Sequence, residues 1–489
     1  MKKLLIVPVL IMLGTIGVFG QYDLQVLQLS QNLYQSDARS AAVGNAMGAV
    51  GANYFSSVIN PAGLAFFRRG EYLISAAFNG INTSSSYLGN EDKTVRNQLS
   101  IPSMGFVFPT INRVNGKVVT DGWVSNTFAF GINRTNSFLG RSYYAGKNTK
   151  SSILDYYVES AEGRTPSQLP NVTWLAYQTW LINNPNMAKS YFSALGDSVS
   201  NYEIAQNKSS ASHGSAYDMN FAYAANYSNI IYLGAKVGIP FVDYINSFSF
   251  NENNLLAGSN YLSSEYESEL DVSAVGFNAG LGIIVKPHKY IRIGGSIMSP
   301  TFYRVTEQYY EQITSELDTT ITDPESIEGK FKYNATTPFK ATASLAIIAG
   351  KSGFISIDYE YIDYSTAILS SNDYPFTYEN KNVNEFYKAA NNIRIGGEYK
   401  IGIFALRGGY AINQSPYDPQ YEPENGDRSY TIYSLGLGLR EKAYYVDLAW
   451  QRFVTNEYEI PYILSSVEVD PATKDIKGTN LIMTVGFRF

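Results

Sequence analysis

The chain has 489 residues and a formal net charge of −6, with 37 Lys and Arg against 43 Asp and Glu. This acidic balance does not provide the basic face that nucleic-acid binding requires, so we expect no nucleic-acid partner. The absence of cysteine excludes a disulfide scaffold and a thiolate metal site. The two histidines, His213 and His288, are too few for a His-rich metal site. The composition therefore indicates no metal and no cofactor.

The composition also narrows the structural class. Charged residues make up 16% of the chain, where about 25% is usual, and Tyr and Gly number 40 each. The only long apolar run is at the N-terminus, whereas a helical membrane bundle needs repeated stretches of about 20 apolar residues. One membrane class stays open: the transmembrane β-barrel, whose signal per strand is weak.

Residues 1–20 have the features of a secretory signal peptide. Lys2 and Lys3 give a positive start, an apolar run covers 4–19, and a small residue, Gly20, precedes the expected cleavage site before Gln21. The alternative is an N-terminal anchor helix, but the run is short and no stop-transfer charges follow it. We expect an exported protein of a bacterial envelope.

From residue 71 onward, apolar and polar residues alternate with a period of two. The last segment shows the pattern best, with one wholly apolar set and one mixed set on opposite faces of a strand. The apolar set is Leu481, Met483, Val485, Phe487 and Phe489. Such a strand, ending on an aromatic residue, suits lipid on one side and a lumen on the other.

We count about fourteen such strands, each near the roughly 9–11 residues that a tilted span needs. Short and long connections alternate between them, as in an outer-membrane barrel, and an even number places both chain ends on the periplasmic side. The sequence therefore predicts an all-β fold, a 14-stranded antiparallel transmembrane barrel over 71–489 with long extracellular loops. The expected spans are 71–83, 98–109, 125–138, 215–228, 230–246, 268–286, 289–303, 331–349, 353–365, 391–400, 402–413, 430–440, 443–456 and 479–489.

The segment before the barrel, residues 21–70, has a different character. Residues 36–51 are mostly small, and Ser36 or Asp37 can cap a short helix there. A helix with so little apolar bulk would be weak alone. It becomes plausible if a barrel lumen encloses it, so we expect 21–70 to form an N-terminal plug.

The residues after that helix read Asn60-Pro61-Ala62-Gly63-Leu64. The succession of a small-residue helix, this motif and a first strand resembles the FadL/TodX-type long-chain fatty-acid transporter family of outer-membrane channels. The resemblance implies a 14-stranded barrel whose N-terminal segment folds into the lumen as a hatch. It also implies passive movement of hydrophobic molecules through a binding pocket and a side opening in the wall.

Within the hatch, we expect Asn60, Pro61, Ala62 and Gly63 to shape the plug. Pro61 fixes its own φ and keeps Asn60 out of helical geometry, and the Asn60 side chain can bond nearby backbone. The alternative is an ordinary Asn-Pro turn leading into a strand.

Charged residues in the predicted strands fall on the faces assigned to the lumen, because each charge on the lipid face would cost about 2–4 kcal/mol at the midplane. Among them, Lys340, Arg394 and Arg407 are candidates to hold a substrate carboxylate. The alternative is that these cations pair with the lumenal acids and anchor the hatch. Gly131, in the third predicted strand, is a candidate for a kink in the wall.

The connection 139–214 is too long to lack structure. A helix is predicted over 173–182, after Pro170, with Trp174, Tyr177 and Leu181 on one face and Trp180 nearby. Such a helix can offer a groove for an apolar ligand or a face for a protein partner, or it can pack locally over the barrel mouth.

Two functions fit these features. The first is an outer-membrane channel for passive uptake of hydrophobic small molecules, long-chain fatty acids or similar compounds, with the bilayer and the ligand as its partners. The alternative is a structural or accessory subunit of an outer-membrane protein secretion or barrel-assembly complex, which other outer-membrane proteins would contact. A general porin fits less well, since a plug segment is present. We find no catalytic constellation and expect no enzyme.

Overall fold

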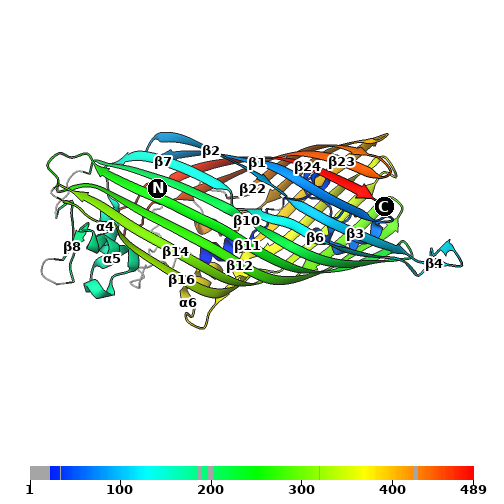
Figure 1. The fold of residues 1–489 in the computed structure, drawn as a ribbon, viewed down its shortest axis with the longest axis horizontal. Helices are drawn as coiled ribbons and strands as arrows, with labels where there is room; N and C mark the ends of the chain where they lie inside the picture. Colours follow the sequence, from blue (N-terminus) through cyan, green and yellow to red (C-terminus); the bar gives the residue numbers. More distant parts are fainter. Residues whose placement is uncertain (1–21, 34, 185–188, 197–201, 319, 422–427) are drawn as a thin grey trace, which may run out of the picture.

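The computed structural model describes residues 22–33, 35–184, 189–196, 202–318, 320–421 and 428–489. The predicted signal peptide, residues 1–20, lies outside these ranges. One large antiparallel sheet dominates the fold and closes on itself, because β1 pairs with β24 on one side and with β2 and β3 on the other. The fold is the predicted all-β barrel (Figure 1).

Fourteen barrel strands result when β2 with β3, β6 with β7, β13 with β14, β16 with β17 and β18 with β19 each count as one interrupted strand. The bounds are β1 (Glu71–Tyr87), β2 (Asn90–Ser100), β3 (Ser103–Ile111), β6 (Trp123–Ser137), β7 (Gly140–Asn148), β10 (Ile204–Tyr227), β11 (Ile231–Asn254), β12 (Tyr261–His288), β13 (Ile291–Met298), β14 (Phe302–Leu317), β16 (Glu325–Thr336), β17 (Lys340–Ile348), β18 (Gly353–Asp363), β19 (Ile368–Ser370), β20 (Ala389–Ile401), β21 (Phe404–Asn413), β22 (Tyr430–Arg440), β23 (Tyr444–Glu459) and β24 (Ala472–Arg488). Three short pairs lie outside the wall or at its rim: β4 (Arg113–Val114) with β5 (Lys117–Val118), β8 (Ile182–Asn183) with β9 (Phe192–Ser193), and β15 (Thr320–Ile321) with β14.

Every predicted span coincides with part of a barrel strand, but the strands on one side of the barrel are much longer than predicted. β10 and β11 have 24 residues each and β12 has 28, whereas β21 and β22 have 10 and 11. The connection expected at 247–267 is therefore only 255–260. The prediction failed there because the outward face becomes polar above the lipid zone while the backbone ladder continues.

The outward face of β12 shows this change directly. Val275, Phe277 and Leu281 are exposed apolar side chains, and Glu267 and Glu269 continue the same outward register beyond them. An apolar outer band that gives way to polar residues is the pattern of a membrane-spanning barrel. The long strands therefore rise above the bilayer as a one-sided wall.

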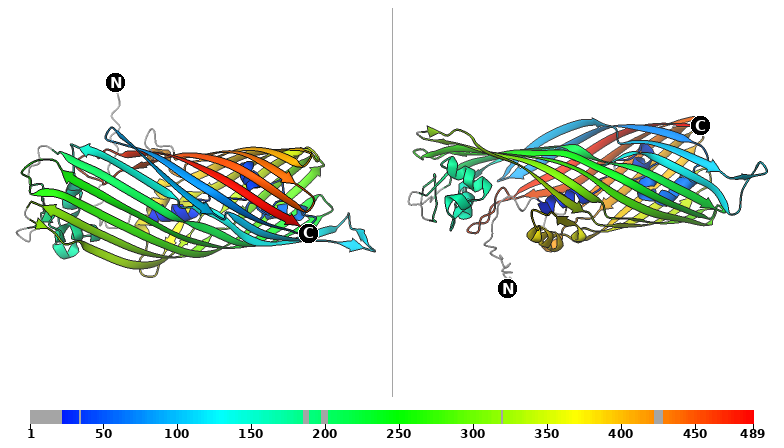
Figure 2. Two further views of the ribbon diagram at one scale, coloured as in Figure 1. Left: turned by 45° about the horizontal axis from the view of Figure 1, so that its top comes forward. Right: turned by 60° about the horizontal axis from the view of Figure 1, so that its bottom comes forward.

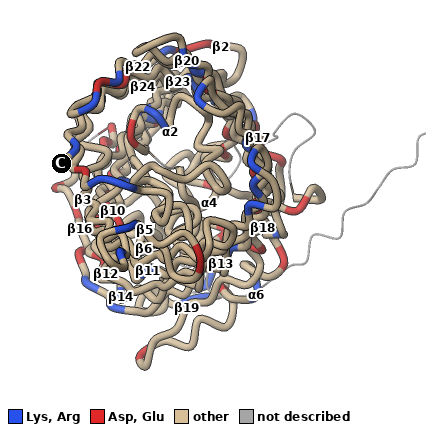
Figure 3. The backbone as a smooth tube through the Cα atoms, turned by 90° about the vertical axis from the view of Figure 1, so that its right-hand side faces the viewer, with Lys and Arg blue, Asp and Glu red and all other residues tan. Residues whose placement is uncertain are grey.

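The hatch lies inside the barrel and comprises α1 (Tyr22–Ser30), α2 (Ala38–Ala42), α3 (Ser56–Ile59) and the 3₁₀ helix η1 (Pro61–Phe66). Both views in Figure 2 show these blue helices enclosed by strands, and in the end-on view the strands form a ring around α2 (Figure 3). The helix predicted over 36–51 is confirmed in place but not in length. Asp37 caps α2 by accepting from the Arg39 and Ser40 amides, and Gly44 and Asn45 leave helical geometry with φ of 63° and 62°.

Of the remaining helices, α4 (Ile153–Ala161) and α5 (Asn171–Gln178) cap the end of the barrel where the strands are long, opposite the C-terminus, whereas α6 (Thr377–Phe386) lies nearer the middle of the long axis and contacts the hatch helix α1 (Figure 1). The short 3₁₀ helices are η2 (Pro166–Gln168), η3 (Tyr364–Thr366) and η4 (Pro419–Tyr421). None of the helices in the described part of the chain is long and apolar enough to cross a membrane.

Candidate functional site: the hatch and an interrupted wall

Asn60 ties the hatch to itself and to the barrel wall. Its Oδ1 accepts from the Ala62 amide at 3.2 Å, which caps η1. Its Nδ2 donates to the carbonyl of Gly48 at 2.8 Å and faces that of Ile283, on β12, at 3.2 Å. A single side chain that offers both a donor and an acceptor is what this junction requires, which explains why an Asn stands here.

The wall makes room for the motif through glycines. A Cβ on Gly282 would lie 2.0 Å from Asn60 Oδ1, and one on Gly234 would lie 2.3 Å from the backbone of Pro61 and Ala62. Within the hatch, a Cβ on Gly63 would meet Ser56 at 2.7 Å. The predicted motif is thus buried at a close contact between hatch and wall. The wall glycines that complete this contact were not singled out from the sequence, because their partners are distant in the chain.

A buried ion network anchors α2 to the wall. Arg39 Nε lies 2.9 Å from Glu398 Oε2, and Arg407 Nε lies 2.7 Å from the same oxygen. Arg407 Nη1 also lies 2.8 Å from Asp447 Oδ1. These side chains are almost completely buried, so the structure places Arg407 in the anchoring network that the sequence left as the alternative.

The other two candidate cations face a different part of the lumen. Arg394 Nη2 lies 2.7 Å from Glu360 Oε1, a buried pair. Lys340 forms no ion pair among the residues that the structure describes, and it lines a lumenal cavity of about 50 Å³. Across this cavity, Lys236 Nζ lies 3.0 Å from Asp218 Oδ2. Of the three predicted lumenal cations, Lys340 is the one that forms no ion pair in the described part of the chain, although the Glu360 carboxylate interacts with it electrostatically.

The barrel wall is interrupted between its second and third strands. In one half of the barrel, β3 pairs with β6 from Ser103↔Asn133 to Ile111↔Ser125. In the half nearer the cap, β2 and β7 lie next to each other (Figure 1) but share no backbone ladder among the described residues. Pro102, at the break between β2 and β3, has no N–H to donate to a ladder.

Side chains of β2 bridge this interruption, which we call the seam. Asn90 Nδ2 donates to the Ala145 carbonyl at 3.1 Å and Thr94 Oγ1 to the Arg141 carbonyl at 2.7 Å. Arg96 Nη1 donates to the Gly140 carbonyl at 3.1 Å. Single side-chain bonds contribute about 0.5–1.5 kcal/mol each, so the seam is the weakest join in the wall.

The hatch closes the end of the seam that lies next to β3. The Gln35 amide donates to the Arg134 carbonyl at 3.2 Å and forms an isolated antiparallel bridge with that residue of β6. Arg134 Nη1 donates back to Gln35 Oε1 at 3.2 Å, and Arg134 Nη2 donates to Gln98 Oε1, on β2, at 3.0 Å. Gln35 of the hatch therefore forms a backbone bridge to β6 at the point where the ladder between the second and third wall strands ends.

Sequence reasoning missed the seam and placed a possible kink at Gly131 instead. Gly131 lies within β6, where a Cβ would meet Tyr54 Oη at 2.4 Å, so the glycine admits a hatch tyrosine. The break in that strand lies at 138–139. Pro102, inside the predicted span 98–109, was the signal that could have located the interruption.

The predicted outer helix is shorter than expected and does not present one apolar face. α5 ends at Gln178, and Trp180 follows in a left-handed conformation with φ of 60°. Leu181 is buried in the core of the cap, where Trp174 and Tyr177 also pack. Of these four residues, only Trp180 projects outward, with 59% of its surface exposed.

In the same cap, burial is the main cause that raises the pKa of Asp155, in α4, above its ordinary value.

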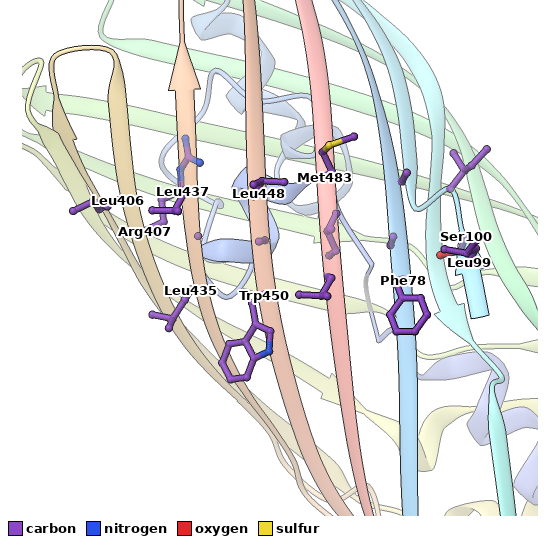
Figure 4. A pocket seen from close by; sticks show the side chains of 17 residues that line it. Phe78, Leu99, Ser100, Leu406, Arg407, Leu435, Leu437, Leu448, Trp450 and Met483 are labelled. Atoms are coloured by element: carbon purple, nitrogen blue, oxygen red, sulfur yellow. The ribbon is translucent and has the colours of Figure 1, made fainter. Parts of the chain in front are cut away.

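A broad apolar depression of about 1080 Å³ lies on the outer face beside the seam. It extends from β2 across β1 to β21–β24, and its outward side chains include Phe78, Leu99, Leu435, Leu448 and Trp450 (Figure 4). Leu99 belongs to the strand that borders the seam. The depression thus continues the seam on the lipid side.

No protein-family model and no curated protein sequence matches the chain. The structure is similar to that of the toluene transporter TodX of P. putida, with a TM-score of 0.56 and 12% identity over 93% of this chain and 98% of that one. A FadL homologue of Pseudomonas aeruginosa is similar with a TM-score of 0.54 and 12% identity, over 94% of this chain and all of the other.

The chain has the fold of the FadL-type channels. The predicted resemblance is therefore confirmed at the level of the fold, including a barrel of fourteen strands and an N-terminal segment in the lumen. In this FadL-type barrel, the hatch both occupies the lumen and closes the seam.

Proposed function

We propose that this protein is an outer-membrane channel for the passive uptake of hydrophobic small molecules, such as long-chain fatty acids. The observation that supports this most strongly is the bridge between Gln35 and Arg134, since the segment that plugs the lumen also closes the wall. Loosening that one segment opens a route from the lumen to the apolar depression outside. TodX, a structure with the same fold, is described as a toluene transporter.

The route runs from the lumen sideways through the seam. A cargo molecule that reaches the cavity beside Lys340 lies near Thr135, which follows Arg134 on β6. From there, the seam leads to the outer depression bordered by Leu99. The route ends on an apolar surface beside the lipid, where an apolar chain leaves water favourably, so diffusion suffices and no energy source is needed.

The cavity also suggests a preference among cargoes. Lys340 forms no ion pair within the described residues, its nearest acidic influence being Glu360, which is already paired with Arg394, and the Lys236–Asp218 pair is close by. A carboxylate headgroup would gain a charge-assisted bond from Lys340. The site therefore fits an amphiphile with a single anionic head and an apolar tail better than a pure hydrocarbon.

A reversible lock between hatch and wall tests the route. The paired residues of an antiparallel bridge have Cα atoms about 4.5–5.5 Å apart, within the range that a disulfide spans. The chain has no cysteine of its own, so Gln35→Cys with Arg134→Cys introduces one defined disulfide. Oxidation should stop uptake of a labelled fatty alcohol into liposomes, and reduction should restore it.

The matched control joins two wall strands at the periplasmic end, Thr110→Cys with Asn126→Cys, a pair in the β3–β6 ladder. Uptake there should be the same before and after reduction. Equal uptake by the oxidised and reduced forms of the hatch lock would contradict hatch-controlled passage.

The accessory-subunit function stays a second candidate because of two projecting features. The long strands β10–β12 rise above the lipid zone, and the β4–β5 hairpin extends from the opposite end with Val114 64% exposed. Native mass spectrometry after gentle extraction separates the two functions. A lone chain that carries an apolar ligand supports the channel, and a stable assembly without ligand supports the subunit.

A further inference from the structure

The apolar depression on the outer face has a well-defined upper row of side chains. Phe78 of β1 stands opposite Leu481 of β24, and Leu481 stands opposite Trp450 of β23. Leu435 of β22 and Leu99 of β2 continue the same row on either side (Figure 4). Because β24 runs toward the C-terminus, which faces the periplasm in a barrel of this kind, the residues before Leu481 lie nearer the cell surface.

Two exposed cations lie just beyond this row, toward the cell surface. Arg452 follows Trp450 by two residues on β23, and Lys477 precedes Leu481 by four residues on β24, so both side chains share the outward face. Lys477 stands opposite Val454, which makes Arg452 its diagonal neighbour, with Cα atoms about 7–8 Å apart. Neither cation forms an ion pair or a side-chain hydrogen bond with another described residue.

Aromatic side chains give the depth of these cations in the bilayer. Arg452 is paired in the ladder with Tyr433, which is 49% exposed, and it follows Trp450 along its strand. Trp and Tyr collect where the hydrocarbon of a membrane meets the headgroups. Arg452 and Lys477 therefore lie at the depth of the headgroups, and the depression extends from them into the hydrocarbon.

The opposite side of the barrel carries the opposite charge at the corresponding position. On β12, Val275 ends the series of exposed apolar side chains, and Asp271 and Glu269 follow on the same outward register. These carboxylates would repel an anionic headgroup. One acid, Asp475, shares the outward face with Lys477, but it lies two residues farther from the lipid zone.

We propose that this face binds a phosphorylated lipid of the outer leaflet, with its acyl chains in the depression and a phosphate held by Arg452 and Lys477. A pair of cations at the depth of the headgroups needs an anion at that depth, and the lipid phosphate supplies it. Arginine presents a planar fork that matches phosphate, and lysine adds a point charge. The inference does not depend on the channel function, because it concerns only the outer face of the wall.

The size of the depression fits a lipid with several acyl chains. Its volume of about 1080 Å³ exceeds the roughly 300–1,000 Å³ of an ordinary small-molecule site. Its walls are almost entirely apolar, with Leu448 and Met483 among the side chains that project into it (Figure 4). A lipid seated there would bury its chains against the wall and present its phosphate to the two cations above.

The test titrates the folded, full-length protein in detergent with lipid A and counts bound lipid by native mass spectrometry. Arg452→Gln combined with Lys477→Gln should weaken binding roughly 30-fold, as expected for two lost contacts between a cation and a phosphate. Lys330→Gln removes an exposed charge from the outer face of β16, which does not border the depression, and should leave binding unchanged. Trp450→Ala should weaken the binding of lipid A and of dephosphorylated lipid A by the same factor.

Dephosphorylated lipid A should bind equally to the wild type and to the double variant. Heat-modifiable migration on gels confirms beforehand that each variant barrel is folded. Unchanged binding of lipid A by the double variant would overturn the inference. Displacement of the lipid by inorganic phosphate alone would also overturn it, since the depression would then contribute nothing. A dimer that excludes lipid A would show instead that a second copy of the chain covers this face.

Discussion

Gly282 and Asn60 meet at one of several close contacts between wall and hatch. The amide of Asn60 fits against β12 only because residue 282 has no side chain, and similar close approaches occur at Gly396 and Gly409, which face Val43 and Gly44 of the hatch. Each of these glycines lies in a strand, where glycine normally weakens a sheet. At the residue scale, glycines that lower the strand propensity of the wall allow the hatch to pack closely against it.

We expect Gly282→Ala to displace the Asn60 side chain, because the new Cβ would lie 2.0 Å from Oδ1. The hatch should then seat less firmly, and ion conductance across planar bilayers should rise. Gly295→Ala, on the adjacent strand, is the matched control, since its nearest atom is 3.9 Å away. Equal conductance in both variants would show that this contact does not hold the hatch.

Helix α2 depends on the barrel for its stability. It has five residues, too few to persist alone in water, and it is held by the Asp37 cap and by the ion network around Glu398. Glu398 pairs with both Arg39 of the hatch and Arg407 of the wall, so the two elements share one carboxylate. At the element scale, the hatch is an insert whose fold is completed by the strands.

Glu398→Gln should destabilise the protein by about 3–5 kcal/mol, because it removes the ion-pair partner of the buried Arg39 guanidinium and leaves Arg407 with Asp447 alone. Asp470→Asn is the comparison, since Asp470 pairs with Lys150 at an exposed site and should cost at most about 1 kcal/mol. Urea unfolding of the refolded protein in detergent measures both. Similar losses in the two variants would mean that the buried network contributes no more than a surface pair.

The whole molecule is asymmetric along its axis. Fourteen strands bring β1 and β24 together, and the C-terminus lies at the end that carries the β4–β5 hairpin, opposite the helical cap (Figure 1). In a barrel with an even number of strands, both ends of the chain face the periplasm and the longer connections face outward. The cap and the tall β10–β12 wall therefore belong on the cell surface.

Single cysteines in this cysteine-free chain test that orientation. Gly258→Cys, in the connection between β11 and β12, should react with an impermeant maleimide on intact cells. Asn115→Cys, in the turn between β4 and β5, should react only after the outer membrane is permeabilised. The reverse pattern of labelling would show the opposite orientation in the membrane. It would contradict a cargo route that begins outside the cell.

The local pattern of the sequence was sufficient for most of the barrel. The period-two alternation in 481–489 depends only on which side chains tolerate lipid, and the structure bears it out, with Leu481 and Met483 exposed and Thr484 buried. The same rule failed where strands leave the membrane. Above the lipid zone, the residues on β12 such as Glu267 and Glu269 no longer need to be apolar, so alternation stops marking the strand.

The sequence by itself determined the fold class, the number of strands, the faces of the wall and the position of the hatch motif, because each depends on local patterns of polarity and backbone geometry. Only the tertiary structure decided where the wall is interrupted and what closes it. That closure joins Gln35, Gln98, Arg134 and Gly214, which lie far apart in the chain. Long-range register brings these residues together, and no local pattern encodes it.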